Sequence, residues 1–126
     1  MANINIKKFY NFHLKKKKIA TMTVVRPPAR WGHAVIKNNF VKKFEEKNQL
    51  NEGWINGGFF IFQKKVFKYF KKFKDKKNII LEEDILPVLA KNNELAAYKH
   101  EGFWQCMDTL RDKNYLNKIW KKSQKW

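Results

Sequence analysis

The most apolar stretch of the chain, residues 54–62 (WINGGFFIF), constrains the fold more than any other segment. Its aromatic and apolar residues, without a helical period, predict a central β-strand. The adjacent Gly57 and Gly58 are costly inside a strand. Glycines at such a position mark either a bulge or the close approach of a ligand or another backbone. The residues alone leave these two alternatives open.

The rest of the chain alternates between strand patterns and helix patterns. Residues 19–25 (IATMTVV) are β-branched and bounded by charge, which predicts a buried strand. Apolar residues at helical spacing predict amphipathic helices, and the aromatic stripe Val66, Phe67, Phe70 and Phe73 is expected in the core. The expected helices are 4–14, 64–74, 81–92 and 110–120, and the other strands are 95–99 and a hairpin of 33–37 with 40–46 across Asn38 and Asn39. This alternation predicts one α/β layered region over residues 1–126.

The net charge of +17 at first suggests a nucleic-acid or polyanion-binding module. Lysines number 25 against three arginines, whereas base recognition and bidentate phosphate contacts favour arginine. Such a module would also need its lysines gathered on one face with aromatics between them, but lysines occur in every segment. Most of the charge is therefore expected on solvated surfaces, and the basic binding module is the alternative reading.

The cysteine content and the apolar runs bear on the cellular setting. Cys106 is the single cysteine, so no internal disulfide can form, and no Cys/His cluster has zinc spacing. The N-terminus lacks the apolar core of a signal peptide, and no apolar run is long enough to cross a bilayer. These features predict a reduced, cytoplasmic setting without a membrane partner.

The stretch from residue 100 to residue 116 (HEGFWQCMDTLRDKNYL) places an acid at the entry to a helix. Thr109 and Asp112 have the spacing of a capping box, which predicts a helix start. Asp108 stands just before it, so it is either a helix cap or a functional carboxylate held by a rigid support. Spacing alone favours the cap.

Four segments together match one family in order and spacing: TVVRPPARWG (23–32), FEEK (44–47), GWINGGFFIF (53–62) and GFWQCMDTLRDKNYL (102–116). With these segments the chain resembles the C-terminal half of the glucose-1-phosphate cytidylyltransferases, a branch of the sugar nucleotidyltransferase family. The resemblance implies the C-terminal half of a three-layer nucleotide-diphospho-sugar transferase fold, with a mixed sheet flanked by helices. The family's Gly-rich loop, catalytic lysine and first metal-binding aspartate have no match here. A fragment, or one part of a split protein, is therefore expected, and no catalytic residue is assigned.

The reaction that the resemblance implies joins CTP and glucose 1-phosphate to give CDP-glucose and pyrophosphate, a step of nucleotide-sugar and O-antigen biosynthesis. The attacking phosphate oxygen is already ionised, so the barrier lies in bringing two anions together, which Mg²⁺ addresses. By similarity, Asp108 is the second metal-binding aspartate, with helix capping as a compatible second role. The region alone is expected to be inactive. A separate N-terminal half and a homo-oligomer of the full enzyme are the expected protein partners.

The resemblance also assigns sugar-phosphate contacts. The family's acid–lysine pair falls on Glu46 and Lys47, with the acid accepting from glucose hydroxyls and the lysine meeting the phosphate. An exposed ion pair is the alternative for both residues, and Asn48 replaces the family's proline after the lysine. The other expected contacts are Asn56 and Gly57 facing the sugar, Gly32 against the glucose ring, and Arg30 in a structural or phosphate-side role.

Overall fold

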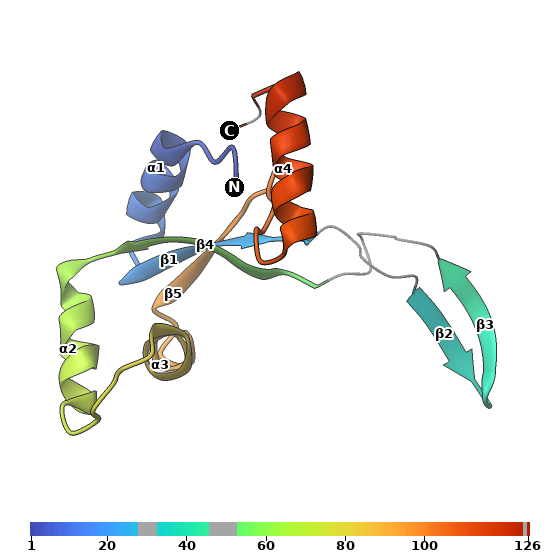
Figure 1. Cartoon of the computed structure of the whole chain (residues 1–126). Helices are drawn as coiled ribbons and strands as arrows, with labels where there is room; N and C mark the ends of the chain where they lie inside the picture. Colours follow the sequence, from blue (N-terminus) through green and yellow to red (C-terminus); the bar gives the residue numbers. More distant parts are fainter. Residues whose placement is uncertain (28–32, 46–52, 125) are drawn as a thin grey trace. The chain divides into compact units, whose positions relative to one another are not determined.

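The computed structural model of the chain describes residues 1–27, 33–45, 53–124 and 126. These residues fall into two compact units: a first unit of Met1–Ile4, Val25–Ile55 and Glu101–Trp126, and a second unit of Asn5–Val24 and Asn56–His100. The elements, labelled in Figure 1, are α1 (Ile6–Lys16), β1 (Ala20–Val25), β2 (His33–Lys37), β3 (Phe40–Glu45), β4 (Ile55–Phe62), α2 (Phe67–Phe70), α3 (Leu86–Lys91), β5 (Leu95–Lys99) and α4 (Leu110–Lys122).

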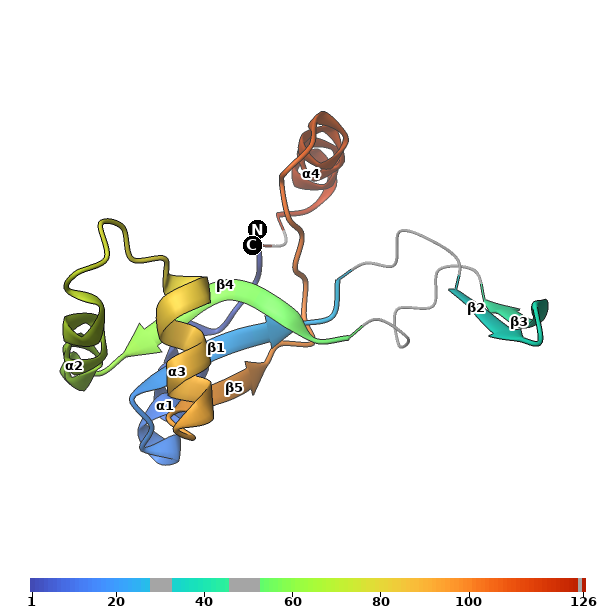
Figure 2. The same cartoon turned by 90° about the horizontal axis from the view of Figure 1, so that it is seen from below.

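The second unit is built on a sheet with the strand order β4-β1-β5. β1 and β5 are parallel, from the pair Ala20 and Leu95 to the pair Val24 and Lys99. β4 runs in the opposite direction (Figure 2), so the sheet is mixed. β1 is therefore the central strand of the described sheet and β4 lies at its edge, and the prediction that 54–62 is central is wrong. The burial agrees, because β1 is almost fully buried whereas β4 is mostly half-buried.

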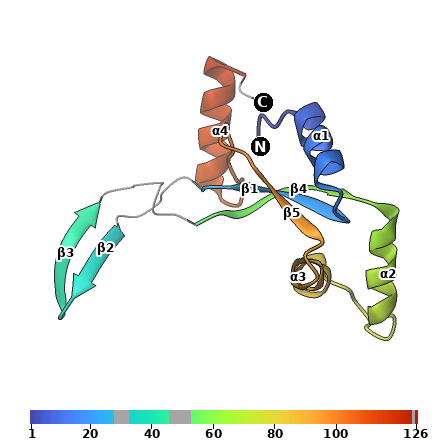
Figure 3. The ribbon, with the colours of Figure 1, turned by 180° about the vertical axis from the view of Figure 1, so that it is seen from behind.

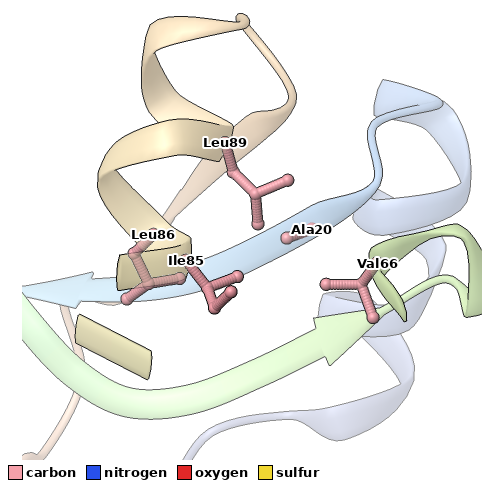
Figure 4. Packing of buried hydrophobic residues seen from close by; sticks show 5 residues of the cluster. All are labelled: Ala20, Val66, Ile85, Leu86 and Leu89. Atoms are coloured by element: carbon pink, nitrogen blue, oxygen red, sulfur yellow. The ribbon is translucent and has the colours of Figure 1, made fainter. Parts of the chain in front are cut away.

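Helices cover both faces of this sheet. Successive side chains of β1 point to opposite faces, so both faces need a covering layer to bury them. Ala20 belongs to the core cluster with Val66, Ile85, Leu86 and Leu89 (Figure 4). The next residue, Thr21, faces α1, where its hydroxyl contacts the buried His13. Figure 3 shows α1 and α3 on opposite sides of the sheet. The second unit is thus a helix–sheet–helix arrangement, and the predicted mixed α/β architecture is confirmed.

Two of the three helices predicted for this unit, 64–74 and 81–92, are present in altered form. Residues 64–73 are helical throughout, but α2 is flanked by 3₁₀ turns at Lys64–Val66 and Lys71–Phe73. A π-helical turn, Leu81–Ile85, precedes α3, and Pro87 lies in the first turn of α3, where its missing N–H is tolerated. One expectation is wrong: Phe70 and Phe73 pack against the core, but Phe67 is 63% exposed.

The hairpin of the first unit forms as predicted, with β2 and β3 antiparallel. Asn38 and Asn39 have φ of 50° and 64°, the left-handed conformation that a tight hairpin turn requires and asparagine tolerates. The register shifts between Val35 and Ile36, as at a bulge. β3 ends at Glu45, and the remainder of the predicted strand lies outside the described residues.

The first unit also contains α4 and the chain segment that leads into it. Residues 1–3 run antiparallel to residues 103–105: Asn3 N donates to Phe103 O (3.1 Å), Gln105 N donates to Met1 O (2.8 Å), and Ala2 bridges Trp104. No sequence pattern predicted this pairing, because it joins residues about a hundred positions apart.

Candidate functional site

The start of α4 is fixed by a capping box, as its spacing predicts. The Thr109 hydroxyl accepts from Asp112 N (3.1 Å), and the Asp112 carboxylate accepts from Thr109 N (3.2 Å) and from Thr109 Oγ1 (2.8 Å). The Gln105 side chain donates a further hydrogen bond to Asp112 Oδ1 at 3.2 Å. Both Gln105 and Asp112 are buried. A buried polar network therefore ties the helix start to the loop before it.

Asp108 lies one residue before this cap, and its side chain is exposed. Because Thr109 is the N-cap, the interpretation of Asp108 as the capping residue is wrong. Within the described ranges, no hydrogen bond or ion pair engages the Asp108 carboxylate. Its backbone is nevertheless well supported, because the capping box follows it and the paired residues 103–105 precede it. The result is an exposed carboxylate on a segment whose backbone is held on both sides.

Aromatic packing supports the same region from the end of α4. The Phe103 ring stacks on the Trp126 ring with centroids 5.3 Å apart, and the Trp120 and Trp126 centroids are 5.1 Å apart. The strand-like residues before Asp108 and the last turn of α4 are therefore held together. No sequence pattern indicates the contact between Phe103 and Trp126.

A second candidate feature is the glycine turn of β4, in the second unit. The Asn56 side chain accepts a hydrogen bond from Gly58 N at 2.8 Å, and Gly58 has φ +83°. A Cβ added to Gly58 would meet nothing within 4 Å, so its backbone conformation, and not crowding, requires glycine here. The positive φ of Gly58 makes the strand backbone irregular here, whereas the predicted bulge and the predicted approach of a ligand both stay predictions.

Thr23 of β1 forms hydrogen bonds to β4 at Phe59, the residue after Gly58. Its hydroxyl accepts from Phe59 N (3.2 Å) and donates to Phe59 O (3.3 Å), so a side chain supplies hydrogen bonds that a strand neighbour usually supplies from its backbone. Thr23 is fully buried. These hydrogen bonds attach β4, the strand that carries Asn56 and Gly57, to the central strand β1. The sequence pattern points to Gly57 and Gly58 as special positions, but nothing in it indicates the role of Thr23.

Four predicted site residues lie outside the described residues: Arg30, Gly32, Glu46 and Lys47. Arg26 belongs to the same sequence motif, residues 23–32, as Arg30 and Gly32. Its guanidinium lies 5.0 Å from the centroid of the Trp54 ring, a cation–π contact within the first unit. Asp108 belongs to the first unit, whereas Asn56 and Gly57 belong to the second.

The chemistry of Asp108 fits one ligand of a magnesium ion. Mg²⁺ prefers carboxylate oxygens, keeps several waters, and is typically held by one or two carboxylates together with substrate phosphates. Among the described residues no group of three or more His, Cys, Asp or Glu side chains has metal-binding geometry. In the same described ranges, no helix combines the length and apolar character that spanning a bilayer demands.

Comparison with known proteins identifies the family. The sequence matches the nucleotidyl transferase family over residues 1–119. Over 124 residues it is 40% identical to the glucose-1-phosphate cytidylyltransferase of Salmonella typhimurium and 37% identical to a protein of Bacillus subtilis assigned the same activity. Each alignment covers 98% of this chain and 47% of the relative, so the chain spans just under half of their length.

A solved structure gives the same result for the fold. A crystal structure from Bacillus anthracis, described as a glucose-1-phosphate thymidylyltransferase in complex with sucrose, matches with a TM-score of 0.68 and 21% sequence identity. The match covers 98% of this chain and 52% of that one. The mixed sheet flanked by helices is thus the arrangement found in a solved protein of this kind. The chain belongs to the nucleotidyl transferase family.

Proposed function

We propose that this chain supplies the sugar-phosphate pocket and one metal-binding carboxylate of a glucose-1-phosphate cytidylyltransferase. The observation that carries the proposal is the 40% identity over 98% of the chain to an enzyme of that name, together with an exposed, rigidly supported Asp108. In the reaction, a phosphate oxygen of glucose 1-phosphate forms a bond to the α-phosphorus of CTP. The bond between that phosphorus and the bridging oxygen breaks, and pyrophosphate leaves.

Asp108 is the proposed Mg²⁺ ligand of this half. When bound, magnesium supplies positive charge that offsets the repulsion between the two anionic substrates. The capping box and the paired residues 103–105 hold the backbone on both sides of Asp108. Such backbone support limits the positions that the carboxylate can reach, which favours a productive arrangement.

The sugar-phosphate side is assigned to the residues that match the family motifs. The Lys47 ammonium meets the phosphate of the substrate, and Glu46 accepts from the glucose hydroxyls. Gly57 lets the backbone approach the sugar closely. The Asn56 carboxamide, whose oxygen accepts from Gly58 N, has its two N–H donors to offer to sugar oxygens. Gly32 at the glucose ring and Arg30 near the phosphate complete the proposed set.

The chain alone is proposed to bind but not to turn over substrate, because no catalytic residue is assigned to it. CTP would be bound mainly by a separate N-terminal half, and the completed enzyme would form a homo-oligomer in the cytoplasm. The net charge of +17 would favour the approach of both anionic substrates.

The test combines binding with reconstitution. Calorimetry should show that glucose 1-phosphate binds the chain more tightly with Mg²⁺ than without it. Asp108→Asn should remove that difference, while Asp75→Asn, a matched change at another exposed aspartate, should retain it. Mixed with the complementary half of the Salmonella typhimurium relative, the chain should release pyrophosphate from CTP, and Asp108→Asn should lower the rate at least about a hundredfold, as loss of a metal-positioned charge does.

Two results would count against the proposal. Equal pyrophosphate release by Asp108→Asn and the unmodified chain would rule out the metal assignment. Failure of glucose 1-phosphate to bind, combined with tight, strongly salt-dependent binding of heparin, would favour the basic polyanion-binding module instead.

A further inference from the structure

The segment 64–77 (KKVFKYFKKFKDKK), which is helical over residues 64–73, carries eight lysines and a single acid. Lys76 is engaged elsewhere: its ammonium lies 2.7 Å from the Asp84 carboxylate. That contact, with a hydrogen bond from Ile80 N, holds the pKa of Asp84 below its usual value. The other lysines of the segment are exposed. The segment is thus a strongly basic surface of the second unit, without an arginine.

The same segment exposes an apolar group. Val66 is buried in the core, which fixes the segment to the sheet, but Phe67 is 63% exposed. Phe67 also lines an open pocket of about 270 Å³, together with Phe62, Gln63, Lys64, Val66, Phe70 and Leu81. The pocket wall is almost entirely carbon. An apolar opening within a lysine-rich segment suits a ligand that has an anionic head and an apolar tail.

We propose that this Phe67 surface, comprising the pocket residues and the exposed lysines of 64–77, docks on an anionic lipid bilayer. Phe67 enters the boundary between headgroups and acyl chains, and the pocket receives acyl-chain carbon. The lysines face anionic headgroups, where each contributes a favourable electrostatic interaction that decays within a Debye length. Such a peripheral contact requires no membrane-spanning segment.

Two observations favour a bilayer over a nucleic acid. The apolar pocket has no use in binding a phosphate backbone, whereas it suits acyl chains. The segment also lacks arginine, the residue that binds phosphate bidentately and stacks on bases. Lysines act instead as point charges, which is sufficient for a fluid layer of anionic headgroups.

The experiment is sedimentation of the chain with vesicles of phosphatidylcholine alone or with phosphatidylglycerol added. Binding is expected only with phosphatidylglycerol. Phe67→Ser should weaken it about fivefold, since partition follows buried apolar area. The triple change Lys64→Gln, Lys68→Gln and Lys71→Gln should weaken it at least about tenfold, given the electrostatic gain per lysine at a membrane surface.

Matched controls separate this surface from a general effect of charge or apolar exposure. Lys7→Gln, Lys8→Gln and Lys15→Gln remove three exposed lysines of α1, and Phe40→Ser removes a phenylalanine that is 68% exposed in β3. Both should retain binding within about twofold, with folding verified by circular dichroism. Equal losses in the controls, equal binding to phosphatidylcholine, or binding of oligothymidine but not vesicles with the same dependence on Phe67 would overturn the proposal.

Discussion

His13 and Thr21 form a buried polar pair between α1 and β1. His13 is 3% exposed, and its Nδ1 lies 2.7 Å from the Thr21 hydroxyl. Burial lowers the pKa of His13 below the ordinary value of 6.5, because the charged ring loses its hydration. The three histidines show no pattern of catalytic spacing, so no sequence pattern singles out this one. The pair joins α1 to the following strand, β1. The spacing of apolar residues predicts each element but not a polar contact between them.

His13 should therefore make stability depend on pH. Above pH 6.5 the ring is neutral in both states, and the stability associated with its burial is fully present. As the pH falls from 6.5 toward the lower folded pKa, only the unfolded chain takes up the proton, and stability is lost. Urea unfolding between pH 7.5 and 5 should show this decline, and His13→Gln should flatten it. A decline unchanged by His13→Gln but removed by His100→Gln would contradict the assignment.

At the scale of elements, the residue patterns predict helices and strands well where their cause is local. The capping box of α4 and the Asn38–Asn39 turn are set by neighbouring residues, and both form as expected. Strand order is set by tertiary pairing, which hydrophobicity along the chain does not encode; the pattern therefore predicts β4 as the central strand, whereas β1 is central in the described sheet. Phe67 follows the helical period, but the 3₁₀ turns around α2 alter which side chains face the core.

Gly58 offers a test of the β4 irregularity. Gly58→Ala should lower the free energy of unfolding by about 1 kcal/mol, because φ +83° disfavours any residue with a Cβ. No steric clash adds to this value, since the space around the added Cβ is open.

Gly53→Ala is the matched control, because Gly53 also has open space but no positive φ. It should be neutral or slightly stabilising. The two variants are compared by urea unfolding. Equal effects of the two changes would show that the backbone conformation of Gly58 carries no strain for alanine.

At the scale of the whole molecule, the charge of +17 acts on every element at once. Like charges repel more in the compact state than in the extended chain, so folding works against this repulsion. Composition predicted the excess, and the lysines occur in both units. Of the predicted site, Asp108 and β4 are described, whereas Glu46 and Lys47 lie outside the described residues.

Salt should therefore stabilise the chain. Raising sodium chloride from about 20 mM to about 500 mM shortens the Debye length severalfold and screens the repulsion. The thermal midpoint at pH 7.5 is expected to rise by several degrees, with most of the rise below about 200 mM. A falling midpoint would show that ion pairs such as Lys76 with Asp84 outweigh the net repulsion.

The side-chain hydrogen bond in the β4 turn also bears on how the protein ages. Asn56 is followed by Gly57, and an asparagine before a glycine cyclises readily to a succinimide, because glycine leaves the attacking backbone nitrogen unhindered. In the folded chain the Asn56 side-chain oxygen is held by Gly58 N, within a strand of the sheet. In the open chain that restraint is lost. Conversion of Asn56 to aspartate would thus proceed during local opening, and the fraction converted in a stored preparation would record how long this strand had spent unfolded.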